Sequence, residues 1–378
     1  MTTSLQQSAS ARKVSSFAAP RLADVCSGRN NNLNLLRVLA AVGVLYAHAY
    51  GIPELAKDDP IERALGLSLG DLGVDVFFFV SGLLITKSFA NKTLTEFAWA
   101  RFVRIFPALW VSSLAFVVVA GLFFSPLSAR EFWSRPETLT YLLRNSTMLP
   151  GLGAQQALPF ALDTHVAEFN QPLWTLPHEL QMYMLLGVLG ALGGLRSVWP
   201  VTGVLSIGLA GVAANKLFGV EPIALDRARF LYFFFAGSLV FLLRKHVVLK
   251  TSWFFGAIAL VAVVLMATPS FAWRQAALLA VLPYLVLWLA FIPGGRVREY
   301  NRLGDYSYGM YIYAYPVQVY LFSAGWTHTP LANLGLALAL TLPLAVLSWH
   351  LLERWALRLP APELLVRLTT ALVPSRFR

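Results

Sequence analysis

The chain has 378 residues, of which 57% are hydrophobic and only 13% carry a charge. Soluble globular proteins are about 45–50% apolar and about 25% charged, so this composition excludes an ordinary soluble enzyme, a disordered chain and a coiled coil. Long apolar segments in lipid satisfy their backbone polar groups by forming helices. We therefore expect an all-α polytopic membrane protein.

The charge balance is basic, with 30 Lys and Arg against 19 Asp and Glu, a formal net charge of +11. A basic balance often indicates nucleic-acid binding, but here the basic residues lie at the ends of apolar runs. The positive-inside rule explains the excess, so no nucleic-acid partner is expected. The one cysteine, Cys26, lies in the polar N-terminal tail, so no internal disulfide can form.

The chain divides into three regions by composition. Residues 1–34 are polar and contain no apolar signal-peptide segment, so they are predicted as a cytoplasmic tail. Residues 35–354 form the predicted membrane domain, and residues 355–378 form a basic cytoplasmic tail. About 17–25 apolar residues cross a bilayer as a helix. Ten predicted spans follow, at residues 35–52, 72–90, 105–125, 173–194, 198–218, 228–243, 252–270, 274–292, 305–324 and 331–352.

The orientation of the spans follows from the distribution of charge. If the N-terminus is inside, most Lys and Arg residues fall in inside segments, and most acidic residues fall outside. This asymmetry predicts that both termini are cytoplasmic. The longest connection, residues 126–172, is expected outside as a loop with short helical pieces, because it contains five prolines.

The first span carries two ionisable residues, and such residues in a membrane segment are costly enough to indicate function. Arg37 and His48 are eleven residues apart, about three turns, so they share one helix face. Histidine is suited to proton transfer near neutral pH, and His48 is expected in the outer half of the membrane. The alternatives are a snorkelling boundary arginine and an interfacial or core-bonded histidine.

Two acidic residues are expected at the depth of His48. Asp75, in the second span, either orients His48 or is solvated at the interface. Glu179 lies about two turns inside the fourth span, where it is either a partner of His48 or a structural hydrogen-bonding group. Ser81 and Gly82, at mid-membrane, favour close helix packing over a nucleophile.

Arg101 and Arg104 open the third span on its cytoplasmic side, three residues apart and so on one face, with Pro107 near the helix start. Two guanidinium groups and a helix N-terminus together favour an anion such as phosphate. The alternative is an ordinary positive-inside pair. The sequence thus predicts an outer acid–base cluster of His48, Asp75 and Glu179 and an inner anion-binding cluster of Arg37, Arg101 and Arg104. This arrangement suits a cytoplasmic phosphorylated donor and an acceptor on the far side.

Several short motifs follow one another in a fixed order. They are Leu36-Arg37 with His48, Gly73–Ile85, Arg101-Phe102-Val103-Arg104, Leu173–Glu179, Leu303–Gly309 and Glu353-Arg354. Together they resemble the integral membrane acyltransferase-3 family of sugar and lipid O-acyltransferases, over nearly the whole chain. Three positions depart from the family pattern: Thr175 replaces a serine, Asn34 replaces an aspartate, and Ala314 stands where many members carry a histidine.

The resemblance implies roles for these residues. His48 would be the catalytic base, and Arg101 and Arg104 would bind an acyl-CoA donor, with Arg37 assisting. Glu179 would orient His48 or stabilise its charge, with Asp75 nearby. Trp174, Tyr183 and Tyr311 are candidates for stacking on a sugar, although Trp and Tyr are also common at membrane interfaces.

The expected activity is that of a membrane O-acyltransferase in the cell's inner membrane. It would move an acyl group, expected to be acetyl, from cytoplasmic acetyl-CoA to a hydroxyl of a carbohydrate. The acceptor would be an exopolysaccharide, a lipopolysaccharide or a lipid-linked precursor, and the partners would include membrane lipids and polysaccharide-assembly proteins. No permanently bound cofactor and no metal are expected. Direct transfer and an acyl-histidine intermediate both remain open, and the rival function is a transporter or flippase of a polysaccharide precursor.

Overall fold

The computed structural model describes residues 19–28, 30–52, 58–148, 170–220, 223–363 and 366. Within these residues the chain is helical, and the β-pairing is a single isolated bridge between Arg21 and Val248. Most of the predicted N-terminal and C-terminal tails, and residues 149–169 of the long predicted loop, lie outside the described residues. The three-region division of the chain stays a prediction.

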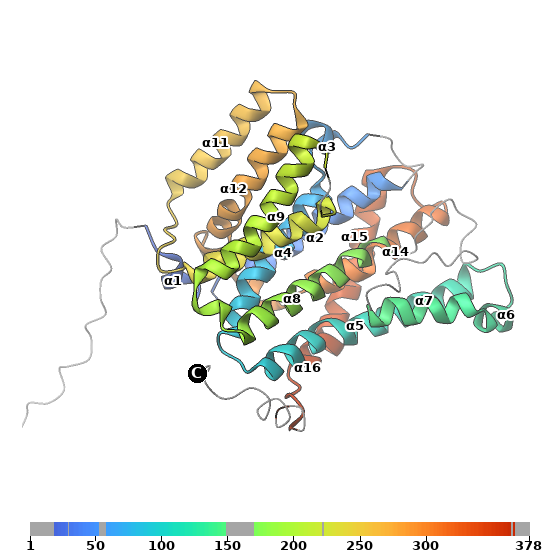
Figure 1. Cartoon of the computed structure of the whole chain (residues 1–378). Coiled ribbons are helices and arrows are strands. Elements are labelled where there is room, and N and C mark those ends of the chain that lie inside the picture. Colours follow the sequence, from blue (N-terminus) through green and yellow to red (C-terminus); the bar gives the residue numbers. More distant parts are fainter. Residues whose placement is uncertain are drawn as a thin grey trace, which may run out of the picture.

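Each of the ten predicted apolar runs coincides with a helix (Figure 1). The ten helices are α2 (Leu33–Gly51), α4 (Leu69–Phe89), α5 (Leu94–Phe123), α8 (Leu176–Ala191), α9 (Val198–Phe218), α10 (Leu225–Leu242), α11 (Thr251–Ala267), α12 (Phe271–Phe291), α14 (Ser307–Ser323) and α15 (Pro330–Ser348). The shorter elements are α1 (Leu22–Val25), α3 (Pro60–Leu65), α6 (Ala129–Ser134), α7 (Pro136–Thr147), η1 (Gln171–Thr175), η2 (Gly194–Arg196), η3 (Gly295–Glu299), α13 (Tyr300–Leu303), η4 (Trp349–Glu353) and α16 (Arg354–Ala356). The predicted helical pieces of the long loop correspond to α6, α7 and η1.

Six helices of the described chain are long and apolar enough to cross a membrane: α2, α4, α5, α9, α12 and α15 with its continuation to Ala356. Three of the other predicted spans are shorter, because α8 has 16 residues and α11 and α14 have 17 each. The remaining one, α10, has 18 residues but carries Asp226, Arg227 and Arg229. The count of ten spans and the orientation of the termini therefore stay predictions.

The start of α5 differs from the predicted one. Thr93 and Glu96 form a reciprocal capping box, which begins the helix at Leu94 rather than at residue 105. Arg101 and Arg104 consequently lie about two turns or more inside α5, and the expectation that they sit at a helix N-terminus is wrong. Pro107 is likewise inside the helix, not near its start.

Glycines allow the closest helix contacts in the bundle. A Cβ atom at Gly82 of α4 would collide with the carbonyl oxygen of Phe234 in α10, and one at Gly237 would collide with that of Phe79. Two helix backbones can approach this closely only where a side chain is missing. The predicted packing role of Gly82 is confirmed.

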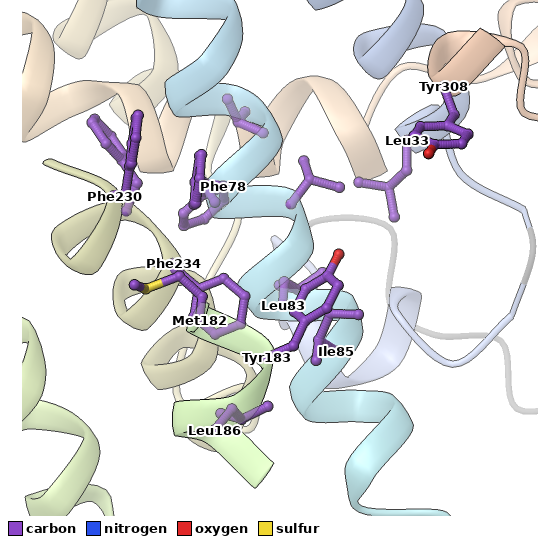
Figure 2. Packing of buried hydrophobic residues seen from close by; sticks show 14 of the residues in the cluster. Leu33, Phe78, Leu83, Ile85, Met182, Tyr183, Leu186, Phe230, Phe234 and Tyr308 are labelled. Atoms are coloured by element: carbon purple, nitrogen blue, oxygen red, sulfur yellow. The ribbon is translucent and has the colours of Figure 1, made fainter. Parts of the chain in front are cut away.

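Aromatic side chains fill the core between α4, α8 and α10 (Figure 2). The rings of Phe78 and Phe230 are stacked, with centroids 4.1 Å apart. On the outside of the bundle the pattern reverses, because large apolar side chains such as Ile207 on α9 and Met266 on α11 are exposed. An apolar exterior of this kind suits contact with lipid.

Figure 1 places α11 and α12 at one edge of the bundle and α6 and α7 at the opposite edge. Helix α14 lies inside, and most of its residues are buried against α2, α5 and α15. It therefore packs beside the residues of the candidate active site.

Candidate active site

A pocket lies inside the bundle where α2, α4, η1, α8 and α14 meet. Its cavity volume is about 40 Å³. Its polar lining consists of Arg37, Ser81, Thr175, Glu179, Ser307, Tyr308 and Tyr311, and its apolar lining of Val74, Phe77, Phe78 and Leu176. A largely apolar cavity with a few convergent polar groups is the usual form of a small-molecule site.

Glu179 is held by two hydroxyl groups. Tyr183, one turn further along α8, donates a hydrogen bond to its carboxylate, and Ser81 donates another at 3.2 Å. Glu179 also lines the same pocket as Arg37. The predicted separation into an outer and an inner layer therefore does not hold for Glu179, which lies near an arginine of the inner group.

The physical reason is the segment before α8. Predicted as the outer end of a continuous span, it instead enters the bundle as the short 3-10 helix η1, with Pro172, Leu173 and Thr175 buried. Helix α8 thus begins inside the protein, and Glu179, close to its start, is carried inward. Apart from its prolines, nothing in this segment of the sequence indicated the entry.

Helix α14 fixes this segment in place. Tyr311 donates to the carbonyl of Pro172 at 2.9 Å, and its hydroxyl lies 2.5 Å from that of Thr175. Asn170 donates to the carbonyl of Ile312 at 3.2 Å. That carbonyl is available because Pro316, four residues later in the helix, has no backbone N–H to offer it.

His48 lies near the end of α2 and is half-buried. Its ring meets the ring of Tyr315 edge-on, with centroids 4.9 Å apart, and the side chain of Gln171 is its hydrogen-bonding neighbour. Among the hydrogen bonds of the described residues, none joins His48 to Glu179. His48 and Glu179, which were expected to pair, thus have separate partners: Tyr315 and Gln171 for His48, and Tyr183 and Ser81 for Glu179. The pocket and His48 both border α14, because Tyr311 in the pocket lining and Tyr315 beside His48 are one turn apart.

Asp75 is fully buried and pairs with a residue that the sequence analysis missed. Arg229 of α10 donates to Asp75 at 2.8 Å and to Asp71 at 2.9 Å. Asp75 thus neither touches His48 nor lies in water, and both expectations for it are wrong. Arg229 is itself an ionisable residue within a predicted span, and this was the signal that could have identified it.

Arg37 and Arg104 share one carboxylate. Both bind Asp305, which precedes α14, with the Arg104 contact at 2.6 Å. Arg104 also binds Glu353 at 3.3 Å, and Ser348 donates to that carboxylate at 2.9 Å. The π-helical turn η4, a form common at functional sites, carries Glu353. Asp305 and Glu353 belong to the motifs noted in the sequence, but their pairing with arginines was not foreseen.

Arg101 differs from the other two arginines of the predicted anion-binding cluster. It lies over the ring of Tyr183, 5.7 Å from the centroid, and Tyr183 in turn binds Glu179. In the described chain no carboxylate lies within ion-pair distance of Arg101, and its buried Nε has no hydrogen-bond partner. Of the three arginines in the predicted anion-binding cluster, Arg101 is thus the one without a carboxylate in ion-pair contact, and Tyr183 is its neighbour.

The three aromatic residues predicted to stack on a sugar have different positions. Tyr311 lines the pocket, whereas the buried Tyr183 presents its hydroxyl to Glu179. Trp174 packs against His178 and Phe230, with centroids 5.8 and 5.6 Å away, and is not part of the pocket lining. Ala314 is buried inside α14. The described residues contain no group of three or more His, Cys, Asp or Glu arranged to hold a metal.

Helices that are long and apolar enough to cross a membrane thus surround an interior pocket with a few convergent polar groups. Residues 30–350 match the family model described as an acyltransferase domain, so the chain belongs to the acyltransferase-3 family, as the motifs indicated. It is a multi-pass membrane acyltransferase that transfers groups other than aminoacyl groups.

Two curated relatives are similar over almost their whole length. An O-acetyl transferase of Shigella phage Sf6 is 28% identical over 354 residues, covering 89% of this chain and 98% of the relative. Nodulation protein 10 of Rhizobium leguminosarum bv. viciae is 28% identical over 382 residues, covering 91% of this chain and 98% of the relative. No solved structure shows a significant match.

Proposed function

We propose that the protein is an inner-membrane O-acetyltransferase that moves an acetyl group from cytoplasmic acetyl-CoA to a hydroxyl of a carbohydrate. The acceptor is a surface polysaccharide or its lipid-linked precursor. The name of the phage relative, an O-acetyl transferase, supports the acetyl group. The observation that carries the proposal is the interior pocket, in which Glu179, Ser81 and Arg37 converge a short distance from the unpaired Arg101.

Donor recognition is assigned mainly to Arg101. The CoA moiety carries phosphates, and an unpaired guanidinium beside the pocket is suited to bind one of them. Arg104 and Arg37 already have carboxylate partners, so they act by holding Asp305 and Glu353 around the donor site. This refines the sequence hypothesis, in which Arg101 and Arg104 had the same role.

The chemical step is assigned to His48. Its imidazole takes the proton of the sugar hydroxyl while the oxygen attacks the thioester carbonyl; the CoA thiolate then leaves and accepts the proton. When His48 takes the proton, it becomes positively charged. Glu179, in the pocket, stabilises this charge electrostatically and not through a direct hydrogen bond to His48. Direct transfer and an acyl-histidine route both remain compatible with this arrangement.

The test uses purified protein in detergent, with acetyl-CoA and a carbohydrate acceptor. His48→Ala is expected to lower acetyl transfer by a factor on the order of 10²–10⁴, the usual contribution of a general base, while acetyl-CoA binding remains. His246→Ala, which changes an exposed histidine, is the matched control and should keep full activity. Full transfer by the His48 variant would refute the proposal. In cells, loss of the protein should remove O-acetyl groups from surface glycans.

A further inference from the structure

His48 has an uncommon partner for a residue assigned as a general base. A catalytic histidine is commonly oriented by a carboxylate that binds the ring nitrogen not used in the reaction. Among the described residues, His48 forms no ion pair, and its hydrogen-bonding neighbour is the neutral side chain of Gln171. Glu179, expected from the sequence to orient the ring, is bound by Ser81 and Tyr183. Gln171 is therefore the candidate for the orienting group.

The backbone on both sides of Gln171 is fixed to α14. The residue before it, Asn170, donates to the carbonyl of Ile312 at 3.2 Å, and the residue after it, Pro172, accepts from Tyr311 at 2.9 Å. Pro172 is buried, and its ring restricts the backbone at the start of η1. The position from which the amide of Gln171 extends is thus determined by α14.

Helix α14 also contacts the imidazole itself. The ring of Tyr315, one turn after Tyr311, meets the ring of His48 edge-on, with centroids 4.9 Å apart. The imidazole therefore has an aromatic neighbour and an amide neighbour, and one helix fixes the positions of both. A catalytic side chain needs support of this kind from residues that are themselves held in place.

We propose that Gln171 is the positioning residue of His48. Its amide oxygen accepts a hydrogen bond from one ring nitrogen, so the other nitrogen has the free lone pair that takes the proton of the sugar hydroxyl. Because an amide is uncharged, it does not hold the acquired proton on the ring as a directly bonded carboxylate would. The protonated ring can then pass its proton to the departing CoA thiolate. This inference rests on the proposed acetyltransferase function and names the group that orients its base.

The test is nuclear magnetic resonance of detergent-solubilised protein in which the histidine ring nitrogens carry ¹⁵N. The signals of His48 are identified by their loss in His48→Ala. We expect the two ring nitrogens of neutral His48 to give well-separated signals, one protonated and one unprotonated, because a single tautomer is populated. If the wild-type protein populates both tautomers, so that the two signals lie close together, the proposal is wrong.

Two substitutions of Gln171 separate orientation from simple packing. Gln171→Leu has no acceptor oxygen, so the two nitrogen signals of His48 should move toward each other. Gln171→Glu keeps an acceptor oxygen in nearly the same shape and should restore the separation. Gln181→Leu is the matched control, because Gln181 hydrogen-bonds the other buried histidine of this region, His178, and its loss should leave the signals of His48 unchanged.

The same variants are then compared in cells, at equal amounts of membrane protein, by the O-acetyl content of surface glycans. Gln171→Leu is expected to lower this content at least tenfold, and Gln181→Leu should not lower it. Equal signals and equal acetylation in Gln171→Leu and wild type would overturn the assignment of Gln171, while loss of acetylation in His48→Ala would still support the proposed function. If Gln171 controls the tautomer but His48→Ala keeps full acetylation, the proposed catalytic function fails instead.

Discussion

Arg104 binds Asp305, 201 residues further along the chain, at 2.6 Å. The same carboxylate binds Arg37, so α2, α5 and the start of α14 meet at one charged point. Burying charges costs free energy that only well-matched partners offset, so each of these groups depends on the others. The cluster thus holds together the helices that border the pocket.

Arg104→Ala is therefore expected to destabilise the protein, because it leaves Asp305 and Glu353 buried with less positive charge around them. Removing one partner of a buried ion pair costs about 3–5 kcal/mol. Thermal unfolding of detergent-solubilised protein measures this loss. Arg135→Ala breaks an exposed ion pair with Glu131 and should cost at most about 1 kcal/mol. Equal melting temperatures for the two variants would contradict the structural role of Arg104.

Arg101→Ala should act on the donor instead. Removing this guanidinium is expected to weaken acetyl-CoA binding at least tenfold, with a smaller loss of melting temperature than Arg104→Ala, because the contact with Tyr183 is lost but no described ion pair is broken. Isothermal titration with acetyl-CoA measures the affinity, and Arg296→Ala, at an exposed site, is the matched control. Unchanged affinity in the Arg101 variant would reject the donor assignment.

Glu179→Gln preserves the shape of the side chain and removes its charge. Acetyl transfer is expected to fall roughly 100-fold, because a neutral amide stabilises a developing positive charge poorly. Tyr183→Phe removes only one of the two hydroxyl donors to Glu179 and should have a smaller effect. The rate is measured with saturating acetyl-CoA. If Glu179→Gln keeps the wild-type rate, Glu179 has only the role of a structural hydrogen-bonding group.

Asp75→Asn tests whether Asp75 is a structural partner of Arg229, as the structure indicates, or a member of the catalytic group, as the sequence suggested. The substitution leaves the buried Arg229 with only Asp71 and Asp226 as acidic partners. We expect a lower melting temperature, with the folded fraction keeping its specific activity. A variant that melts like the wild type but has lost acetyl transfer would return Asp75 to the catalytic group.

Apolar run length identified the helices because crossing a bilayer requires a fixed number of apolar residues, and all ten runs coincide with helices in the structure. The boundary of α5 was missed because a local cap, Thr93 with Glu96, extends the helix beyond its apolar part. The depth of a side chain in the membrane was harder to predict, because counting residues from the start of a span assumes that the span starts at the membrane surface. Helix α8 instead starts among buried residues inside the bundle.

The pairing of side chains was the part that could not be read from one sequence. Arg37, Arg101, Asp75 and Glu179 were recognised as unusual from their types and positions alone. Which carboxylate binds which guanidinium depends on how helices far apart in the chain are brought together. Arg229 with Asp75, and Asp305 with Arg104, are separated by 154 and 201 residues.

Proline at position 316 removes one amide hydrogen from α14, and Asn170 uses the carbonyl that this leaves free. Restoring an amide there, as in Pro316→Ala, would let the helix compete for its own oxygen. The hydrogen bond from Asn170, which helps to keep Gln171 beside His48, would then weaken, although no residue of the pocket had been altered. In this enzyme, one missing amide hydrogen in α14 thus helps to position the segment that precedes α8.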